Sequence, residues 1–230
     1  MNKLINIKQG TTSITNIQYI INNIPDPYDL TEDERYYYLF DQNKLFIEDK
    51  ASDCENNKIE QEESKLDEDT KNDIFVENIF AYIKLKTLHE LLGNFLLKLY
   101  KKKNIEKQSI HVTDCSRLNF VYAELEKGIN KVRWKSDIKG VNITKIIIDP
   151  LLEYIEERVS KYQTKLLKRI VKEKGKCRRD GVNMALSDTL MDMLDETNKK
   201  NKNFELKNKI LNYIAPRLKI DKNVLNKKII

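Results

Sequence analysis

Two stretches of the sequence concentrate cations in a way that suits binding to an anion. Residues 130–140, NKVRWKSDIKG, place Lys131, Arg133 and Lys135 around Trp134, the only tryptophan of the chain. Residues 168–181, KRIVKEKGKCRRDG, hold seven cations against two acids. Such cations make phosphate contacts, and a tryptophan among them can stack on a base. The two stretches therefore predict a nucleic-acid interface.

The expected interface combines members of both stretches. Its residues are Lys131, Arg133, Lys135, Arg169, Lys172, Lys176, Arg178 and Arg179. Arginine is the more informative cation, because an AT-rich genome inflates lysine whereas most arginine codons are GC-rich. Seven of the eight arginines lie at or after Arg117, and arginine binds phosphate in a bidentate way. Nothing indicates base-specific readout, so we expect an electrostatic contact with DNA or RNA. The alternative for both stretches is a solvated charged face.

Trp134 fits a buried position better than a base-stacking one. If residues 132–134 form a strand, Val132 and Trp134 share one face, while Lys131, Arg133 and Lys135 share the other. This alternation predicts a tryptophan turned toward the core and cations turned toward solvent.

Catalytic patterns are weak by comparison. Asp137-Ile-Lys139 matches the D/E-x-K fragment of one nuclease class, in which Asp114 would be the second Mg²⁺ carboxylate. The same pattern occurs at four other places in this charged chain, so a Mg²⁺-dependent nuclease is a distant third hypothesis. His111 and Cys115 lack the second ligand pair of a zinc site. We expect no catalytic residue, no cofactor and no metal.

Charge divides the chain into regions. Residues 1–97 carry a net charge of −9 and residues 98–230 one of +15. Residues 48–73 hold 11 acids, 4 lysines and few apolar side chains, a composition typical of a disordered linker. Its alternative role is to fold back over the basic half and compete with an anionic ligand. We predict a small helical unit at 1–47, this acidic linker at 48–73, and a basic, mostly helical module at 74–230.

Hydrophobic spacing predicts a mainly α fold with a small β element near 110–148. The expected strands are 110–114 and a hairpin formed by residues 132–134 and 141–148. The expected helices are 11–24, a helix after the 31–34 capping box, 74–101 with a break near Gly93, 117–127, 150–174, 183–197 and 204–215.

The long helix at 150–174 carries the second functional hypothesis. Asp149 is its predicted N-cap and Pro150 suits its first helical position. Its apolar residues, which include Leu152, Ile155, Val159, Tyr162 and Leu166, follow a 3-4-3-4 rhythm. A helical protein-interaction or structural protein would dock a partner there through side chains such as Val159 and Leu166. We expect no signal peptide and no membrane span. With three scattered cysteines, an intracellular site in cytoplasm or nucleus is the simplest expectation, and a virion is the alternative.

Overall fold

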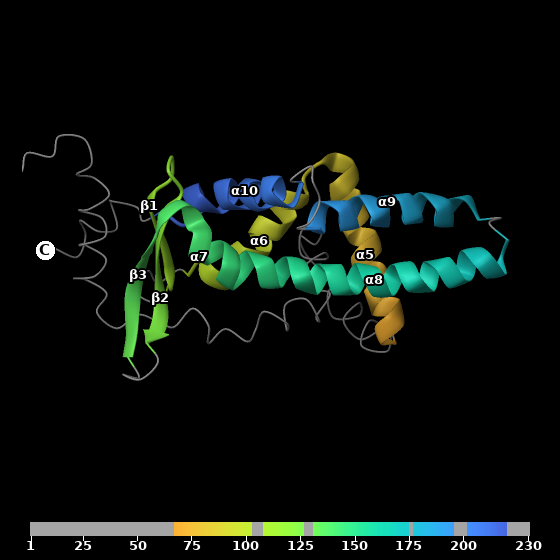
Figure 1. The fold of residues 1–230 in the computed structure, drawn as a ribbon, viewed down its shortest axis with the longest axis horizontal. Helices are drawn as coiled ribbons and strands as arrows, with labels where there is room; N and C mark the ends of the chain where they lie inside the picture. Colours follow the sequence, from red (N-terminus) through yellow and green to blue (C-terminus); the bar gives the residue numbers. More distant parts are fainter. Residues whose placement is uncertain (1–66, 103–107, 127–130, 175–176, 196–201, 220–230) are drawn as a thin grey trace, which may run out of the picture. The chain divides into compact units, whose positions relative to one another are not determined.

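The computed structural model describes residues 67–102, 108–126, 131–174, 177–195 and 202–219. Within these residues five long helices accompany one antiparallel sheet with the strand order β1-β2-β3 (Figure 1). The prediction of a mainly α fold with a small β element is confirmed. The predicted 1–47 unit, including its helices, and the acidic stretch up to residue 66 lie outside the described residues.

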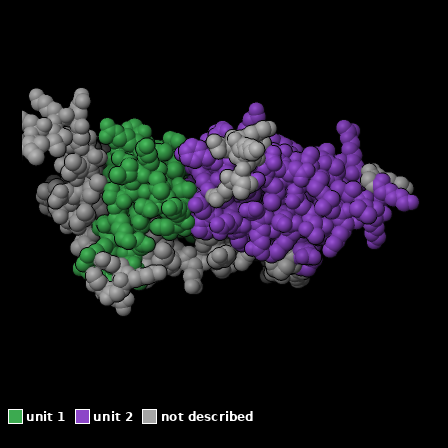
Figure 2. All heavy atoms as spheres, viewed as in Figure 1, with its two compact units in different colours: residues 1–33, 96–146, 211–230 green, residues 34–95, 147–210 purple. Residues whose placement is uncertain are grey.

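The chain divides into two compact units (Figure 2). Of the described residues, unit 1 comprises 96–102, 108–126, 131–146 and 211–219, and unit 2 comprises 67–95, 147–174, 177–195 and 202–210. The predicted module from residue 74 onward thus contributes to both units. No helix of the described residues is long and apolar enough to cross a membrane.

Unit 2 is built around α5 (Glu68–Leu85), α8 (Asp149–Lys172) and α9 (Arg178–Leu194). α8 and α9 form an antiparallel pair, and α5 contacts both. α5 starts inside the range predicted as linker, because the Asp67 carboxylate caps it by accepting the backbone N–H of Thr70 at 2.9 Å. The first turns of α6 (Leu88–Tyr100) and α10 (Lys202–Ile214) complete the unit.

The predicted helix at 74–101 is in fact two helices, and its break is not at Gly93. The chain turns at Lys86, whose φ of 59° is left-handed. The N–H groups of Lys86 and Thr87 bond to the carbonyls of Ile83 and Tyr82 at 3.0 and 2.9 Å, which closes α5 as a glycine at this position would. Because a lysine stands where glycine is usual, the sequence offered no signal for this break.

The stripe predicted for the long helix is buried in the core of unit 2. Its members are Leu152, Ile155, Val159, Tyr162 and Leu166. Val159 is 0% exposed and Leu166 is 1% exposed, so the proposal that a partner docks on these two side chains is wrong. The predicted cap is also wrong: Asp149 lies in the first turn of α8, where its carboxylate pairs with Lys207 at 2.9 Å.

Unit 1 contains the sheet of β1 (Ile110–Asp114), β2 (Asn119–Glu126) and β3 (Lys131–Asp137). β1 is where the sequence predicts it. The helix predicted at 117–127 is wrong, since these residues form β2. Phe120, Val121, Tyr122 and Ala123 are all buried, so β2 is apolar on both faces. A continuous apolar run of this kind fits a helix and a strand equally well.

The hairpin predicted between residues 132–134 and 141–148 is also wrong. β3 pairs with β2, and residues 141–148 are helical, in α7 (Val141–Ile143) and the π-helical turn Thr144–Ile148. Asp137 starts this segment, because its carboxylate accepts the N–H groups of Asn142 at 3.0 Å and Ile143 at 2.8 Å. A capping interaction of this type is worth about 1 kcal/mol or more.

Candidate nucleic-acid interface

α8 separates its charges along its length. Four carboxylates lie in the first half, and six cations with no acid among them lie between Arg158 and Lys172. This order complements the helix dipole, which favours acids near the start and cations near the end. The second half of α8 is therefore the most cationic helical surface of unit 2 within the described residues.

Four of these cations form a row on one side of α8. Lys161, Lys165, Lys168 and Lys172 are spaced four, three and four residues apart, and all four are exposed. Residues at this spacing lie on one helical face. At 1.5 Å per residue the row is about 16 Å long, roughly the length of five nucleotide steps of one strand at 3.4 Å each. We call these four residues the lysine row.

The lysine row is only partly neutralised. Lys161 pairs with Glu157 at 2.6 Å, and Lys165 pairs with Asp73 of α5 at 2.7 Å. Lys168 and Lys172 make no ion pair with any residue that the structure describes. Exposed pairs of this type contribute about 0–1 kcal/mol, so phosphates can compete for their lysines.

A groove of about 730 Å³ lies beside the row, between α5 and α8. On the α8 side it is lined by the cations Arg158, Lys161, Lys165 and Lys168, the hydroxyls of Ser160 and Thr164, the Tyr154 ring and the Glu157 carboxylate. On the α5 side it is lined by oxygen acceptors, which belong to Asp69, Asn72 and Asp73. The α8 wall is thus mostly cationic with one carboxylate, Glu157, while the α5 wall carries oxygen acceptors.

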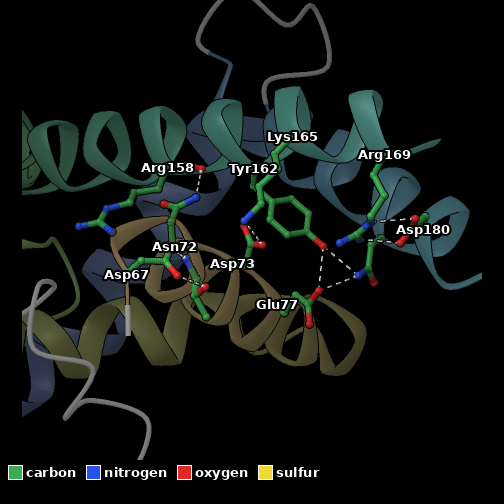
Figure 3. A network of polar contacts seen from close by, with 11 residues as sticks. Asp67, Asn72, Asp73, Glu77, Arg158, Tyr162, Lys165, Arg169 and Asp180 are labelled. Atoms are coloured by element: carbon green, nitrogen blue, oxygen red, sulfur yellow. Dashed lines mark hydrogen bonds and ion pairs between the residues drawn. The ribbon is translucent and has the colours of Figure 1, made fainter. Parts of the chain in front are cut away.

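A polar network joins the three helices next to this groove (Figure 3). The Tyr162 hydroxyl donates to Glu77 at 3.0 Å, and the Asn183 amide lies 2.8 Å from that hydroxyl and 3.1 Å from Glu77. Burial, and then the negative charge of Glu77, raise the pKa of Tyr162 above its ordinary range. The hydroxyl therefore stays protonated, and the network holds α5, α8 and α9 in register.

Two of the predicted phosphate-binding arginines form ion pairs with carboxylates of unit 2. Arg169 binds Asp180 in a bidentate way, with N–O distances of 2.9 and 2.6 Å, and Asp180 is only 3% exposed. Arg179 binds Glu77 at 2.7 Å. Arg169 thus fixes the end of α8 to the start of α9, and this structural role accounts for its position.

The other predicted residues of this stretch lie at the surface. Lys172 and Arg178 are exposed, and Arg178 is the first residue of α9. Arg179 keeps 73% of its side chain exposed despite its ion pair. Lys176 lies outside the described residues. Unit 2 therefore brings Arg169, Lys172, Arg178 and Arg179 to the connected ends of α8 and α9.

The remaining predicted residues, Lys131, Arg133 and Lys135, belong to β3 in unit 1. All three are exposed, whereas Val132 and Trp134 are half-buried, so the predicted alternation is confirmed. Trp134 contacts the His111 ring, with centroids 5.3 Å apart. Lys135 pairs with Glu124, which is also the cross-strand partner of Arg133. We call these three cations the strand cations.

The rival nuclease residues have structural roles. Both oxygens of Asp137 accept backbone N–H groups, and Asp114 accepts those of Ser116 and Arg117 at 3.0 and 3.2 Å. β2 lies between the strands that carry the two carboxylates. Among the described residues no group of three or more His, Cys, Asp and Glu side chains could hold a metal ion.

Sequence reasoning missed most of the lysine row. Only Lys172 was among the predicted interface residues, although 150–174 was predicted to be helical and the 4-3-4 spacing of Lys161, Lys165, Lys168 and Lys172 could be read from it. The acidic wall of the groove had no such signal, because Asp69 and Asp73 fall in the stretch predicted as linker. Comparison of the chain with protein-family models, curated proteins and solved structures finds no match.

Proposed function

We propose that this chain binds nucleic acid without sequence-specific readout, through the lysine row of α8 and the arginines at the start of α9. The observation that carries the proposal is the lysine row itself. Four exposed lysines share one face of a helix that has no acid between Arg158 and Lys172. Phosphate backbones bind such rows through charge and release of counterions.

The ion pair of Arg169 with Asp180 removes Arg169 from the residues proposed to contact phosphate. Its guanidinium is bound to a buried carboxylate, so it positions the α8–α9 connection, and Lys172, Arg178 and Arg179 supply contacts there. Lys161, Lys165 and Lys168 extend the site along α8. The strand cations are a second proposed element, weaker because Glu124 lies among them.

The test is fluorescence anisotropy with labelled RNA and DNA, from low to physiological salt, on the full chain. Lys161→Gln/Lys168→Gln/Lys172→Gln should lower affinity about 30-fold and reduce the salt slope by about 2, since each lost phosphate contact removes roughly 0.7–0.9 of slope. Lys86→Gln/Lys145→Gln/Lys209→Gln is the matched control. It removes the same charge from exposed lysines elsewhere and should have a small effect.

Absence of binding at low salt would remove the proposal. Equal losses in the row and control variants would reduce it to a net-charge effect. Salt-tolerant association with a protein would instead support the helical-interaction hypothesis. It would have to use exposed α8 residues such as Leu167 and Val171, which are 52% and 76% exposed.

A further inference from the structure

We infer that the groove between α5 and α8 binds single-stranded RNA in preference to DNA. In each of its two lysine–carboxylate pairs, the lysine can bind a phosphate oxygen of the ligand. The carboxylate then accepts a hydrogen bond from a ribose 2′-hydroxyl. The inference rests on the proposed function and adds the class of nucleic acid that the site takes.

The argument begins with the Lys165–Asp73 pair, which joins the two walls of the groove. Lys165 Nζ lies 2.7 Å from Asp73 Oδ2, and the two side chains are 43% and 22% exposed. A phosphate that recruits Lys165 takes it away from Asp73. The carboxylate is then left beside an incoming negative charge unless the ligand also supplies a hydrogen-bond donor.

A second pair repeats the same arrangement on the α8 side. Lys161 Nζ lies 2.6 Å from Glu157 Oε1, and both residues line the groove. A ligand that uses both lysines must therefore satisfy both Asp73 and Glu157. RNA carries a 2′-hydroxyl donor close to each phosphate, whereas DNA has only the phosphate.

The α5 wall lacks donors independently of these pairs. Asn72 is 7% exposed, and its amide nitrogen donates to the Arg158 carbonyl at 3.1 Å. The buried oxygens Asn72 Oδ1 and Asp73 Oδ1 have no hydrogen-bond partner among the described residues. Buried acceptors are normally paired, so this wall is suited to a ligand rich in hydroxyl or amino donors.

The Tyr154 end of the groove favours an unpaired strand. The Arg158 guanidinium lies over the Tyr154 ring at 5.0 Å and over the Phe75 ring at 5.7 Å. Tyr154 and Arg158 both line the groove. Unpaired bases stack on aromatic rings and on guanidinium planes of this kind, whereas the bases of a duplex are not available for it.

The experiment compares oligoadenylates of about 12 nucleotides in three forms: RNA, DNA and 2′-O-methyl RNA. Wild type should bind RNA about tenfold more tightly than the other two, since a hydrogen bond to a charged group has this order of effect. Asp73→Ala should bind DNA more tightly and lower the RNA-to-DNA ratio, with Glu157 left as the one paired carboxylate that still favours RNA. Asp192→Ala is the control, because it makes the same Asp-to-Ala change at an exposed position of α9. It should leave the RNA-to-DNA ratio unchanged.

The outcomes separate this inference from the proposed function. Equal affinity of wild type for RNA and DNA would overturn the RNA preference and leave nucleic-acid binding in place. Equal affinity for RNA and 2′-O-methyl RNA would assign the preference to strand shape and overturn the hydroxyl exchange. Absence of binding to every oligonucleotide at low salt would overturn both. The wild-type comparison decides even where Asp73→Ala fails to fold.

Discussion

Unit 1 and unit 2 each carry exposed cations and a buried ring that can ionise. The two units differ in which of these groups has an ion-pair or hydrogen-bond partner. In unit 1 the strand cations are accompanied by Glu124, while the buried His111 ring has no partner for Nε2 among the described residues. In unit 2 the Tyr162 hydroxyl is bonded to Glu77 and Asn183, while two lysines of the row make no described ion pair.

The difference indicates which polar groups of each unit remain available for protonation or ligand binding. Unit 1 is balanced at the β3 surface and incomplete in its interior, so its interior should respond to solution conditions. Unit 2 pairs its buried ionisable ring, Tyr162, and leaves cations unbalanced along α8, so its surface should respond to ligands. A run of cations in the sequence therefore does not define a basic face, because the neighbouring element decides how much charge remains.

The largest expected effect is the loss of stability of unit 1 in acid. Burial lowers the pKa of His111 from 6.5 to about 4. As pH falls from 6.5 toward 4, the unfolded chain binds a proton that the folded chain does not, so the free energy of unfolding falls by about 3 kcal/mol. Urea unfolding followed by the emission of Trp134, the single tryptophan, measures this loss.

His111→Gln is the control for the acid effect. It cannot take up this proton, so its stability should depend less on pH across that window. Equal pH dependence of the two proteins would assign the acid sensitivity to carboxylates and not to the buried ring.

Removal of the Asp137 carboxylate should have the next largest effect. Asp137 is 1% exposed and accepts two backbone N–H groups. Asp137→Ala leaves both donors unpaired and should lower the free energy of unfolding by about 2 kcal/mol, measured through Trp134 emission in urea. Unchanged stability together with loss of a Mg²⁺-dependent cleavage activity would instead support the nuclease hypothesis.

Unit 2 should lose less from the corresponding change in its own network. Tyr162→Phe removes the hydroxyl that joins Glu77 and Asn183 and should cost about 1 kcal/mol, measured by circular dichroism in urea. Because the pKa of Tyr162 is raised above 10, wild type should also lose stability above pH 10, where only the unfolded tyrosine ionises. The phenylalanine variant should lack this alkaline contribution.

Neutralising the strand cations should have the smallest effect. Lys131→Gln/Arg133→Gln/Lys135→Gln should weaken RNA and DNA binding by less than about threefold, because exposed charges that already face a carboxylate contribute little. Fluorescence anisotropy at the salt concentrations used for the lysine-row variant measures this change in affinity. A loss as large as that of the row variant would end the distinction between the two units.

The sequence predicted the elements whose patterns are long and regular. The stripe from Leu152 to Leu166 identified α8, and β1 and α10 were expected close to their observed positions. α9 was expected too, but it begins five residues before the predicted start at residue 183. Failures came where a local pattern was ambiguous or decided by distant contacts. β2 is apolar on both faces, and α5 ends at a left-handed lysine.

The candidate interface was predictable to a similar degree. The surface position of Lys172, Arg178 and Arg179 was expected from the concentration of cations in residues 168–181, and the alternation around Trp134 followed from the period of a strand. The pairing of Arg169 with Asp180 depends on how two helices meet. The groove wall depends on a contact between Asp73 and Lys165, which are 92 residues apart, and spacing within one helix carries no information about it.

The link between β1 and the last described residues bears on how this protein folds during synthesis. Val112 forms a parallel bridge with Lys219, and its N–H bonds to the Leu218 carbonyl at 3.4 Å. The three strands can pair as soon as residue 137 has left the ribosome, since their contacts are local. Among the described residues, the segment that pairs with this edge of β1 is synthesised about 80 residues later, which takes several seconds at 5–20 residues per second. During that interval this edge lacks its described partner, and a strand edge without its partner can pair with another nascent chain.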